Sequence, residues 1–218
     1  MWLHREKALA IQIQKHIISL KKSFMLGVVL CGGQSSRMGS DKGLLMLSDK
    51  TWTQKAIDTL SNFQIPIAIS VNKNQYHNYS TIFSIDTLIP DDPSLQLRGP
   101  LCGLLSVHLK YPEEDLLILA CDMPLIDTEL IKQLLSKYST ETADDAFIYT
   151  NDAELEPMPG IYKSNGLAYV HQLYSTNQLP RHRMKYMLEH ISTYLCPLPL
   201  DKKGRFRNFN THSELNGL

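Results

Sequence analysis

The sequence has few of the residue patterns that mark metal-binding or disulfide-rich proteins. Its four cysteines, Cys31, Cys102, Cys121 and Cys196, lie far apart, and no two of them form a C-x-x-C pair. Such isolated cysteines are typical of small buried residues in a reducing compartment, not of disulfides or zinc ligands. The eight histidines are equally scattered, with no H-x-x-x-H pair, which argues against a histidine-based metal site.

An excess of one charge and a long apolar run are absent as well. Lys and Arg together number 22, as do Asp and Glu, and this balance argues against a protein that coats nucleic acid or a membrane surface. Charged and polar residues interrupt the apolar positions of residues 1–23, which therefore do not resemble a signal peptide or a membrane span. We expect a cytoplasmic protein that binds neither nucleic acid nor membrane, with 43% hydrophobic residues to form a core.

Short apolar runs alternate with helical patterns along the chain. We expect a helical extension over residues 1–23 and one domain over residues 24–218. The predicted strands are 24–30, 65–71, 81–89, 115–121, 146–150, 158–162 and 194–198. The predicted helices are 53–60, 101–111, one that Asp127 caps, 165–174, 181–190 and a terminal one that Thr211 caps.

This alternation predicts an α/β fold with three layers, in which helices cover both faces of a mostly parallel sheet. Ligands of such sheets bind beyond the carboxyl ends of the strands. The loops after Leu30, Val71 and Cys121 should therefore meet in one crevice.

The first predicted strand runs into a glycine-rich loop, LCGGQSSRMGSDK, at Leu30–Lys42. Gly32 and Gly33 let backbone N–H groups approach an anion closely, and Arg37 and Lys42 add positive charge. The spacing matches neither a P-loop nor G-x-G-x-x-G. Chance charges in a solvated turn are the alternative explanation, but this combination directly after a buried strand favours a cradle for phosphates.

A carboxylate at the end of an interior strand is the candidate metal ligand. Asp122 follows the predicted strand 115–121, and Mg²⁺ takes one or two protein carboxylates together with phosphate oxygens and water. Position alone is equally consistent with an aspartate that caps a helix or turn. Asp41 is a weaker candidate, with an alternative role in orienting Arg37 or Lys42.

The glycine-rich loop resembles the L-[AG]-G-G-x-S-x-R-M-G-x-D-K signature of the MobA-like nucleotidyltransferases, with Cys31 in place of the usual alanine. Further segments match that family in order: Asn72, RGPLCGLLS at 98–106, ACDMPL at 120–125, EPMPGIYK at 156–163 and FRNFNTHSEL at 206–215. The resemblance covers nearly the whole chain from residue 25 onward, and its last segment favours the guanylyl branch of the family.

The resemblance implies a Rossmann-like nucleotidyltransferase fold and transfer of GMP from GTP to the terminal phosphate of molybdopterin or Mo-molybdopterin, with Mg²⁺ as cofactor and pyrophosphate released. The catalytic residues that it implies are Arg37, Lys42 and Asp122, the last also binding the metal. The nucleotide-binding residues that it implies are Leu30, Cys31, Gly32, Gly33, Lys42, Asn72, Asp92 and Asp122.

Two of these assignments have alternatives. The expected nucleotide-contacting aspartate is Asp92, but the adjacent Asp91 fits the family spacing if the register shifts by one, and an ordinary D-D-P turn explains the pair equally well. Asn72 either bonds to the base or ribose or caps the end of a strand. Gly32 and Gly33 favour GTP over CTP, because cytidylyl relatives usually read L-A-A-G at this loop.

The acceptor site is less specific in the sequence. Asn208 and Asn210 match a family motif linked to the pterin acceptor, although His212 and Ser213 replace the usual Pro-Glu. The basic segment that contains Arg181, Arg183 and Lys185 could receive an anionic acceptor, but a solvated helix face is the commoner explanation. Molybdenum-insertion proteins and the molybdoenzymes that receive the cofactor are the partners that the resemblance implies.

Two other functions remain open at this point. One is a related enzyme of the same fold that uses CTP on molybdopterin or a nucleoside triphosphate on a sugar phosphate. The other, from a different class, is a non-catalytic nucleotide-binding module. Arg37, Lys42 and Asp122 together favour an enzyme, because binding alone does not require a metal-binding carboxylate.

Overall fold

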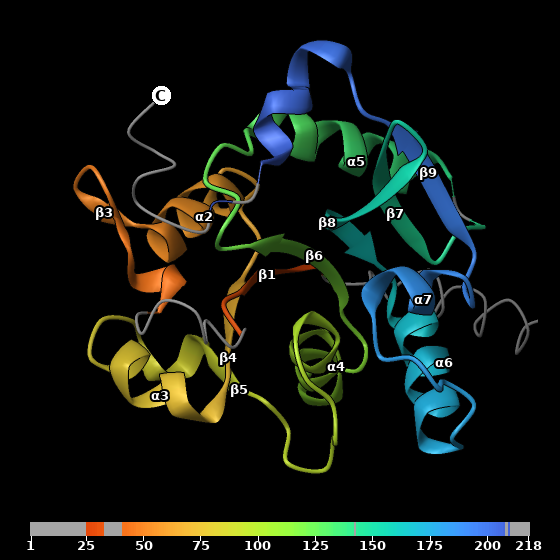
Figure 1. The fold of residues 1–218 in the computed structure, drawn as a ribbon, viewed down its shortest axis with the longest axis horizontal. Helices are drawn as coiled ribbons and strands as arrows, with labels where there is room; N and C mark the ends of the chain where they lie inside the picture. The colour runs from red at the N-terminus through yellow and green to blue at the C-terminus, as the bar shows by residue number, and fades with distance from the viewer. Residues whose placement is uncertain (1–24, 33–40, 142, 208, 210–218) are drawn as a thin grey trace, which may run out of the picture.

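A computed structural model describes residues 25–32, 41–141, 143–207 and 209 (Figure 1). The expected extension over residues 1–23 and the cap at Thr211 lie outside these residues, as do four expected site residues: Gly33, Arg37, Asn208 and Asn210. Seven of the described strands form one sheet in the order β5-β4-β1-β6-β8-β7-β9.

The strands and helices follow the predicted alternation. The strands are β1 Met25–Leu30, β2 Met46–Leu47, β3 Lys50–Thr51, β4 Ile67–Val71, β5 Leu88–Pro90, β6 Asp115–Ala120, β7 Ala146–Asn151, β8 Glu154–Tyr162 and β9 Thr193–Pro197. The helices are α2 Trp52–Ser61, α3 Lys73–Ser80, α4 Pro100–Lys110, α5 Thr128–Thr140, α6 Ser164–Ser175 and α7 Met184–Leu188, with short 3-10 turns at Lys42–Leu44, Ile85–Thr87 and Leu200–Phe206. Asp127 caps α5 as expected, since its carboxylate accepts from the amide of Leu130 at 3.1 Å.

The seven-stranded sheet is mostly parallel, as predicted. The pairs β1–β4, β4–β5, β1–β6 and β7–β9 are parallel, while β8 is antiparallel to both β6 and β7. Strand β8 therefore begins where β6 ends. Residues at the start of β8 thus lie at the same sheet edge as the residues that follow β6.

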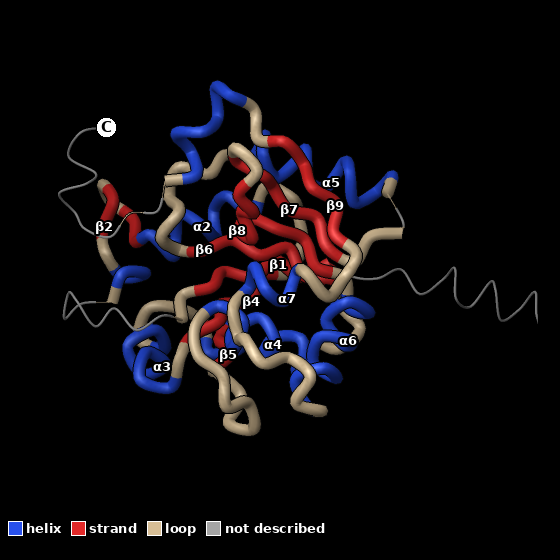
Figure 2. The backbone as a smooth tube through the Cα atoms, turned by 45° about the vertical axis from the view of Figure 1, so that its right-hand side comes forward, coloured by secondary structure: helices blue, strands red, loops and turns tan. Residues whose placement is uncertain are grey.

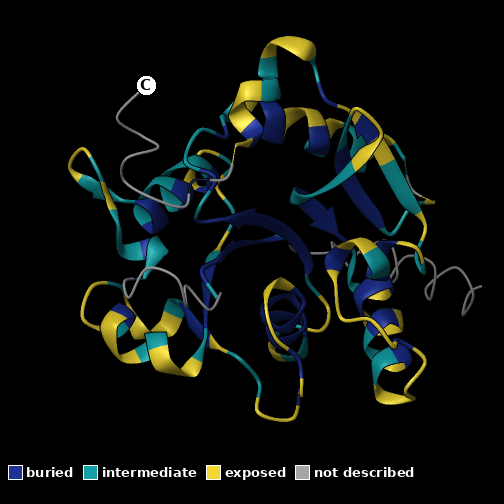
Figure 3. Cartoon of the chain, in the orientation of Figure 1, coloured by how far each residue is buried: buried dark blue, intermediate teal, exposed yellow. Residues whose placement is uncertain are grey.

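Helices cover both faces of the sheet, and β1 shows why. Its side chains alternate between the faces: Val28 packs in a cluster with α4, α6 and α7, whereas Val29 packs in a cluster with α2 and α5. Figure 1 shows α5 on one side of the sheet and α4 and α6 on the other. The strands at the centre of the sheet are the most deeply buried elements (Figure 3).

Helix α4 packs closely against β1 and β4 at Gly103, which has no side chain. A Cβ on Gly103 would lie 2.5 Å from the Ser70 hydroxyl and 3.3 Å from Leu30. The glycine in the LCGLLS segment therefore serves the packing of the helix on the sheet. This close contact sets the height of the start of α4 above the carboxyl end of β1.

Two sequence predictions were wrong. A strand was expected over 81–89, but the structure has helix α3 over Lys73–Ser80, a short turn and only three strand residues, Leu88–Pro90. Helix α3 has no apolar stripe and is held instead by a capping box between Asn72 and Gln75, so apolar periodicity could not reveal it.

The predicted helix over 181–190 shortens to α7, Met184–Leu188. Residue Arg183 has extended backbone, with φ −110° and ψ 142°. No helix is present over 178–183, and residues 180–183 are exposed between the buried side chains of Leu179 and Met184. The basic segment that contains Arg181 and Arg183 is therefore a surface loop and not a helix face.

Candidate nucleotide-binding site

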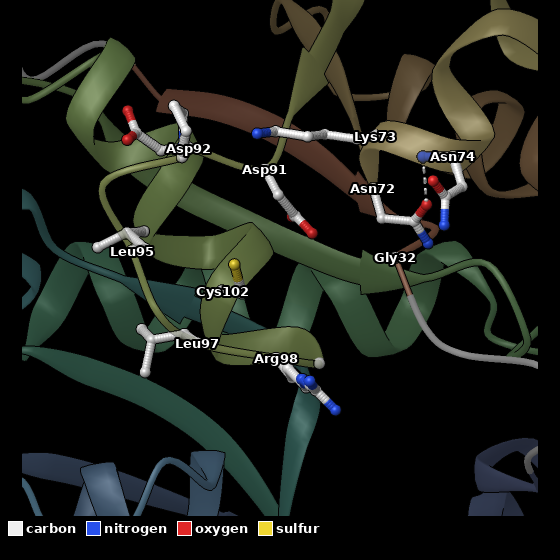
Figure 4. A pocket seen from close by; sticks show the side chains of 12 residues that line it. Gly32, Asn72, Lys73, Asn74, Asp91, Asp92, Leu95, Leu97, Arg98 and Cys102 are labelled. Atoms are coloured by element: carbon white, nitrogen blue, oxygen red, sulfur yellow. Dashed lines mark hydrogen bonds between the residues drawn. The ribbon is translucent and has the colours of Figure 1, made fainter.

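The loops that follow β1, β4 and β5 meet at one edge of the sheet, as the sequence predicted for the first two. Gly32, Asn72 and Asp91 line a cleft of about 380 Å³ at this edge, and the start of α4 closes it from the far side (Figure 4). The helix after β1 packs on one face of the sheet and the helix before β6 on the other. A crevice at the carboxyl ends of such strands is the usual binding place in open α/β sheets.

Lys42 and Asp122 meet at the same edge of the sheet, where β1 and β6 end side by side with Leu30 paired to Ala120. Lys42 begins the 3-10 turn after the glycine-rich loop, and its Nζ lies 3.8 Å from Oδ2 of Asp122, two residues beyond β6. About a quarter of each side chain is exposed, 24% and 26%. Burial raises the pKa of Asp122, while the nearby ammonium group of Lys42 opposes that shift. The pair is thus a cation and a carboxylate in a partly desolvated position.

Gln75 ties the two ends of the glycine-rich loop together. Its side-chain amide donates to the Cys31 carbonyl at 2.9 Å, before the loop, and to Oδ2 of Asp41 at 2.7 Å, after the loop. Its Oε1 accepts from the backbone N–H of Asn72 at 3.0 Å. One side chain on α3 therefore fixes three segments that are far apart in the sequence, and we call this arrangement the Gln75 clamp.

Asp41 is fully engaged in holding the loop end. Besides Gln75, its carboxylate accepts from the amide of Gly43 at 3.0 Å and from the hydroxyl of Tyr79 at 3.1 Å. Gly43 has no room for a side chain, since a Cβ there would overlap the Tyr79 hydroxyl. These contacts tie Asp41 to Gln75, Gly43 and Tyr79, while the alternative role of orienting Arg37 or Lys42 stays a prediction.

Asp91 and Asp92 face different directions. The Asp91 carboxylate points into the cleft beside Cys102, and that of Asp92 points away from it (Figure 4). The Asp92 carboxylate accepts from the amide and the hydroxyl of Ser94 at 2.8 and 2.6 Å. Burial raises the pKa of Asp91, although a hydrogen bond from the Cys102 thiol and the charge of Lys73 oppose the shift. Of the two carboxylates, that of Asp91 is placed to meet a ligand.

Asn72 caps a helix and not only the end of a strand. Its Oδ1 accepts from the amides of Asn74 at 2.9 Å and Gln75 at 3.0 Å, at the start of α3.

On the opposite wall of the cleft, Gly99 has φ +74°, in the left-handed region that favours glycine, and it precedes Pro100 at the start of α4. Arg98 lies just before this turn and lines the cleft.

Phe209, near the C-terminus, contacts Asp122, the candidate metal ligand. The amide of Phe209 donates to the carbonyl of Asp122 at 3.0 Å, and the Phe209 ring is fully buried against Trp52. Asn208 and Asn210 lie outside the described residues, but the residue between them is anchored at Asp122. The anchor places Phe209 beside the residue that follows the end of β6.

The buried thiols at the strand ends do not suit a nucleophile. A hydrogen bond with Cys31, together with burial, raises the pKa of the Cys121 thiol well above its usual value. Burial and the neighbouring Asp91 raise the pKa of Cys102 to about 11. The thiolate form, which is the reactive one, is therefore disfavoured at both positions.

Sequence reasoning missed several residues of this site. It named neither Gln75 nor Tyr79, and it named Arg98 only as part of a matching segment. The N-x-x-Q spacing of Asn72 and Gln75 is a capping-box signal that would have located α3. No local pattern could have revealed that Gln75 also reaches Cys31 and Asp41, because those contacts span 44 and 34 residues.

These features together define a class of protein. A mostly parallel sheet, a glycine-rich loop after its central strand and a lysine–carboxylate pair beside a cleft are the parts of an α/β enzyme that acts on a nucleoside triphosphate. Comparison with known proteins makes the class specific. The family model described as the MobA-like NTP transferase domain matches residues 27–191, and the chain belongs to this family of nucleotidyltransferases.

Individual relatives agree with the family. A "Probable molybdenum cofactor guanylyltransferase" of Flavobacterium johnsoniae is 28% identical over 190 residues, which cover 87% of this chain and 94% of the relative. The fold is similar to that of molybdopterin-guanine dinucleotide biosynthesis protein A from Archaeoglobus fulgidus, with a TM-score of 0.69 and 20% identity over 89% of this chain and 96% of that one.

The same fold occurs in 4-diphosphocytidyl-2C-methyl-D-erythritol synthase from Anaerococcus prevotii, with a TM-score of 0.64 and 10% identity over 89% of this chain and 94% of that one. At such identities the structural likeness establishes the fold alone. Within the described residues, no helix is both long and apolar enough to span a membrane.

Proposed function

We propose that this nucleotidyltransferase transfers GMP from GTP to the terminal phosphate of molybdopterin or Mo-molybdopterin. An oxygen of the acceptor phosphate forms a bond to the α-phosphorus of GTP, the bond from that phosphorus to the bridging oxygen of the β-phosphate breaks, and pyrophosphate leaves. The observation that carries the proposal is the Lys42–Asp122 pair, which lies at the sheet edge where β1 and β6 end side by side. The names of the curated relatives support the choice of acceptor and nucleotide.

The acceptor in this reaction supplies its own nucleophile. A phosphate monoester has a second pKa of about 6, so it is largely ionised at neutral pH and needs no strong general base. This agrees with buried thiols whose pKa values are raised at Cys102 and Cys121. Catalysis would then depend on positioning and on neutralising charge at the triphosphate.

The residues at the strand ends divide this work in the proposal. Lys42, together with Arg37 of the glycine-rich loop, compensates the charge of the leaving pyrophosphate. Backbone N–H groups from Gly32 and Gly33 bind the phosphates. Asn208 and Asn210, on either side of the anchored Phe209, are proposed to contact the acceptor, as the family motif implies.

Asp122 fits the role of a Mg²⁺ ligand in its chemistry and in its surroundings. It offers hard carboxylate oxygens just beyond the end of β6, and the described residues contain no group of three or more His, Cys, Asp or Glu side chains that could hold a metal ion by themselves. A single protein carboxylate suits Mg²⁺, which keeps waters and phosphate oxygens as its other ligands. When bound, Mg²⁺ supplies positive charge to the triphosphate.

Asp91 is the residue that we assign to guanine. Guanine presents its N1–H and N2–H₂ donors together, and one carboxylate can accept from both. The Asp91 carboxylate faces the cleft, whereas the expected Asp92 is bonded to Ser94 on the rim. The proposal therefore places Asp91 at the base and keeps Asp92 as part of the rim that also lines the cleft.

A pyrophosphate-release assay with each of the four nucleoside triphosphates tests the proposal, with molybdopterin, glucose 1-phosphate or no acceptor, and with and without Mg²⁺. We expect release only when GTP, molybdopterin and Mg²⁺ are all present. Release with CTP and molybdopterin would instead identify a cytidylyl enzyme, and release with a sugar phosphate would identify another acceptor. GTP binding without release under any of these conditions would identify a non-catalytic binding module.

A further inference from the structure

A second hollow lies at the same end of the molecule as the nucleotide cleft. It has a volume of about 540 Å³, within the range of small-molecule sites. Arg98, just before α4, lines both the hollow and the nucleotide cleft. The two spaces are therefore neighbours that share one wall.

The direction of β8 places this hollow at the catalytic edge of the sheet. Strand β8 is antiparallel to β6, and Gly160 pairs with Ile118. Met158 therefore lies near the end of β6, and that end is two residues before Asp122 in the sequence. Met158 lines the hollow. Helix α7, which also lines the hollow, contacts β8, and Figure 2 shows it on the same face of the sheet as α4 and α6.

The hollow combines an apolar floor with an excess of positive charge. Leu101, Met158 and Tyr186 are among its apolar lining residues. Its other charged lining residues, besides Arg98, are Arg181, Arg183, Lys185 and Glu189. A ring can rest on the floor while cations at the rim bind an anionic group.

Two of these arginines have no carboxylate partner in the described part of the chain. Lys185 is paired with Glu154 at 2.7 Å, but no ion pair joins Arg181 or Arg183 to an acidic side chain of the described residues. The Arg181 guanidinium lies 5.4 Å from the centre of the Tyr186 ring, which fixes its direction without neutralising it. Exposed arginines held over an apolar hollow are suited to a phosphate-bearing ligand.

We propose that this hollow binds the acceptor, a phosphate-bearing molecule with a flat ring system, and that Arg181 and Arg183 compensate its negative charge. The inference rests on the proposed function, since it assigns a place to the acceptor of that reaction. GTP in the cleft at Gly32 and the acceptor in the hollow then lie on opposite sides of Arg98. The acceptor can thus reach the α-phosphate beside Asp122 without crossing the base site at Asp91.

The test measures the binding of two ligands separately. Equilibrium titrations with molybdopterin and with GTP–Mg²⁺ are carried out on the wild type and on R181A/R183A. The control K110A/K132A removes two exposed lysines that line neither the cleft nor the hollow. We expect R181A/R183A to bind molybdopterin about tenfold or more weakly, since two charge-assisted contacts are lost, and to bind GTP within about twofold of the wild type.

A second variant examines charge without removing it. R181K/R183K should recover part of the molybdopterin affinity, and that affinity should fall with added salt, because exposed charges are screened. A shape change alone predicts neither result. Wild-type molybdopterin binding by R181A/R183A would overturn the inference, and so would an equal loss of GTP affinity.

Failure of the proposed function has a different signature. If the wild type binds glucose 1-phosphate but not molybdopterin, and R181A/R183A loses that binding, the hollow is the acceptor site and the proposed acceptor is wrong. If the wild type binds neither compound, the hollow is not an acceptor site for phosphate-bearing molecules and the inference is rejected.

Discussion

The Gln75 clamp provides the sharpest prediction about how this fold prepares its phosphate loop. Gln75 donates to the Cys31 carbonyl and to Asp41, the residues on either side of the glycine-rich loop. If the clamp positions the loop, weakening it should reduce GTP affinity more than it reduces the stability of the protein. Two substitutions of Gln75 distinguish the loss of its hydrogen bonds from a change in its charge and donor groups.

Gln75→Ala removes three hydrogen bonds, two with neutral partners and one with a carboxylate. Such bonds contribute about 1 kcal/mol each with neutral partners and about 2 kcal/mol with a charged one, so the gross loss is about 4 kcal/mol. Gln75, Asp41 and Asn72 are only partly buried, although Cys31 is buried, so water replaces some of these bonds. We expect a net cost of about 2 kcal/mol to the ordered loop, or about 30-fold in GTP affinity.

Gln75→Glu should be worse than Gln75→Ala at alkaline pH, although it hardly changes the shape of the side chain. It keeps the acceptor for the Asn72 amide but turns an acceptor oxygen toward the Cys31 carbonyl and Asp41. Two carboxylates that share a site favour protonation of one of them, which restores a donor. The defect should therefore shrink as the solution is taken from about pH 8 to about pH 6.

Calorimetric titration of GTP–Mg²⁺ and thermal melting check both variants. Gln133→Glu, the same amide-to-acid change on the exposed side of α5, is the matched control, and it should bind GTP as the wild type does. Wild-type GTP affinity in both Gln75 variants would refute the reasoning. A pH-independent loss in Gln75→Glu would show that the carboxyl group does not meet Asp41.

Three further substitutions test other parts of the site. Asp122→Asn preserves the shape beside Lys42 but removes the anionic ligand, so turnover should fall by about 10²–10³ with little change in melting temperature, as steady-state kinetics over a Mg²⁺ series would reveal. Gly43→Ala places a methyl group on the Tyr79 hydroxyl and should destabilise the protein by about 1–3 kcal/mol, with partial rescue by Tyr79→Phe in denaturant titrations. Asp91→Asn should raise the melting temperature at neutral pH and weaken GTP binding. Burial raises the pKa of Asp91, so its contribution to stability is present at acidic pH and is lost as the pH rises through the folded-state pKa.

Each of these outcomes has a clear opposite. Wild-type turnover and Mg²⁺ dependence in Asp122→Asn would show that Asp122 does not bind the metal and serves only to form the turn after β6. An unchanged denaturation midpoint in Gly43→Ala would mean that the backbone at residue 43 shifts away from Tyr79 without measurable cost. If Asp91→Asn kept full GTP affinity while gaining stability, the guanine assignment would be wrong even though the electrostatic argument held.

Most of the α/β architecture could be predicted from local pattern. Strands β1 and β6 are buried on both sides, so their apolar runs are unmistakable, and α5 shows both its cap at Asp127 and its apolar stripe. Helix α3 was not predicted, because it is stabilised by a polar capping box and has no apolar face. The helix predicted over 181–190 began too early, because Arg183 has extended backbone and the helix begins at Met184.

The sequence by itself determined the kinds of residue at the site: glycines after the first strand, a lysine at the loop end and an aspartate after β6. Only the tertiary structure decided which of them meet. The turn that carries Asp91 and Asp92 is bonded to α4 through the Asp92 amide and the Ser106 hydroxyl, and the Gln75 clamp depends on contacts across 44 and 34 residues. The reversed direction of β8 brings Met158 and the basic segment to the catalytic edge. Local sequence encodes backbone preference and chemistry, whereas side-chain direction and proximity follow from the packing of segments that are distant in the chain.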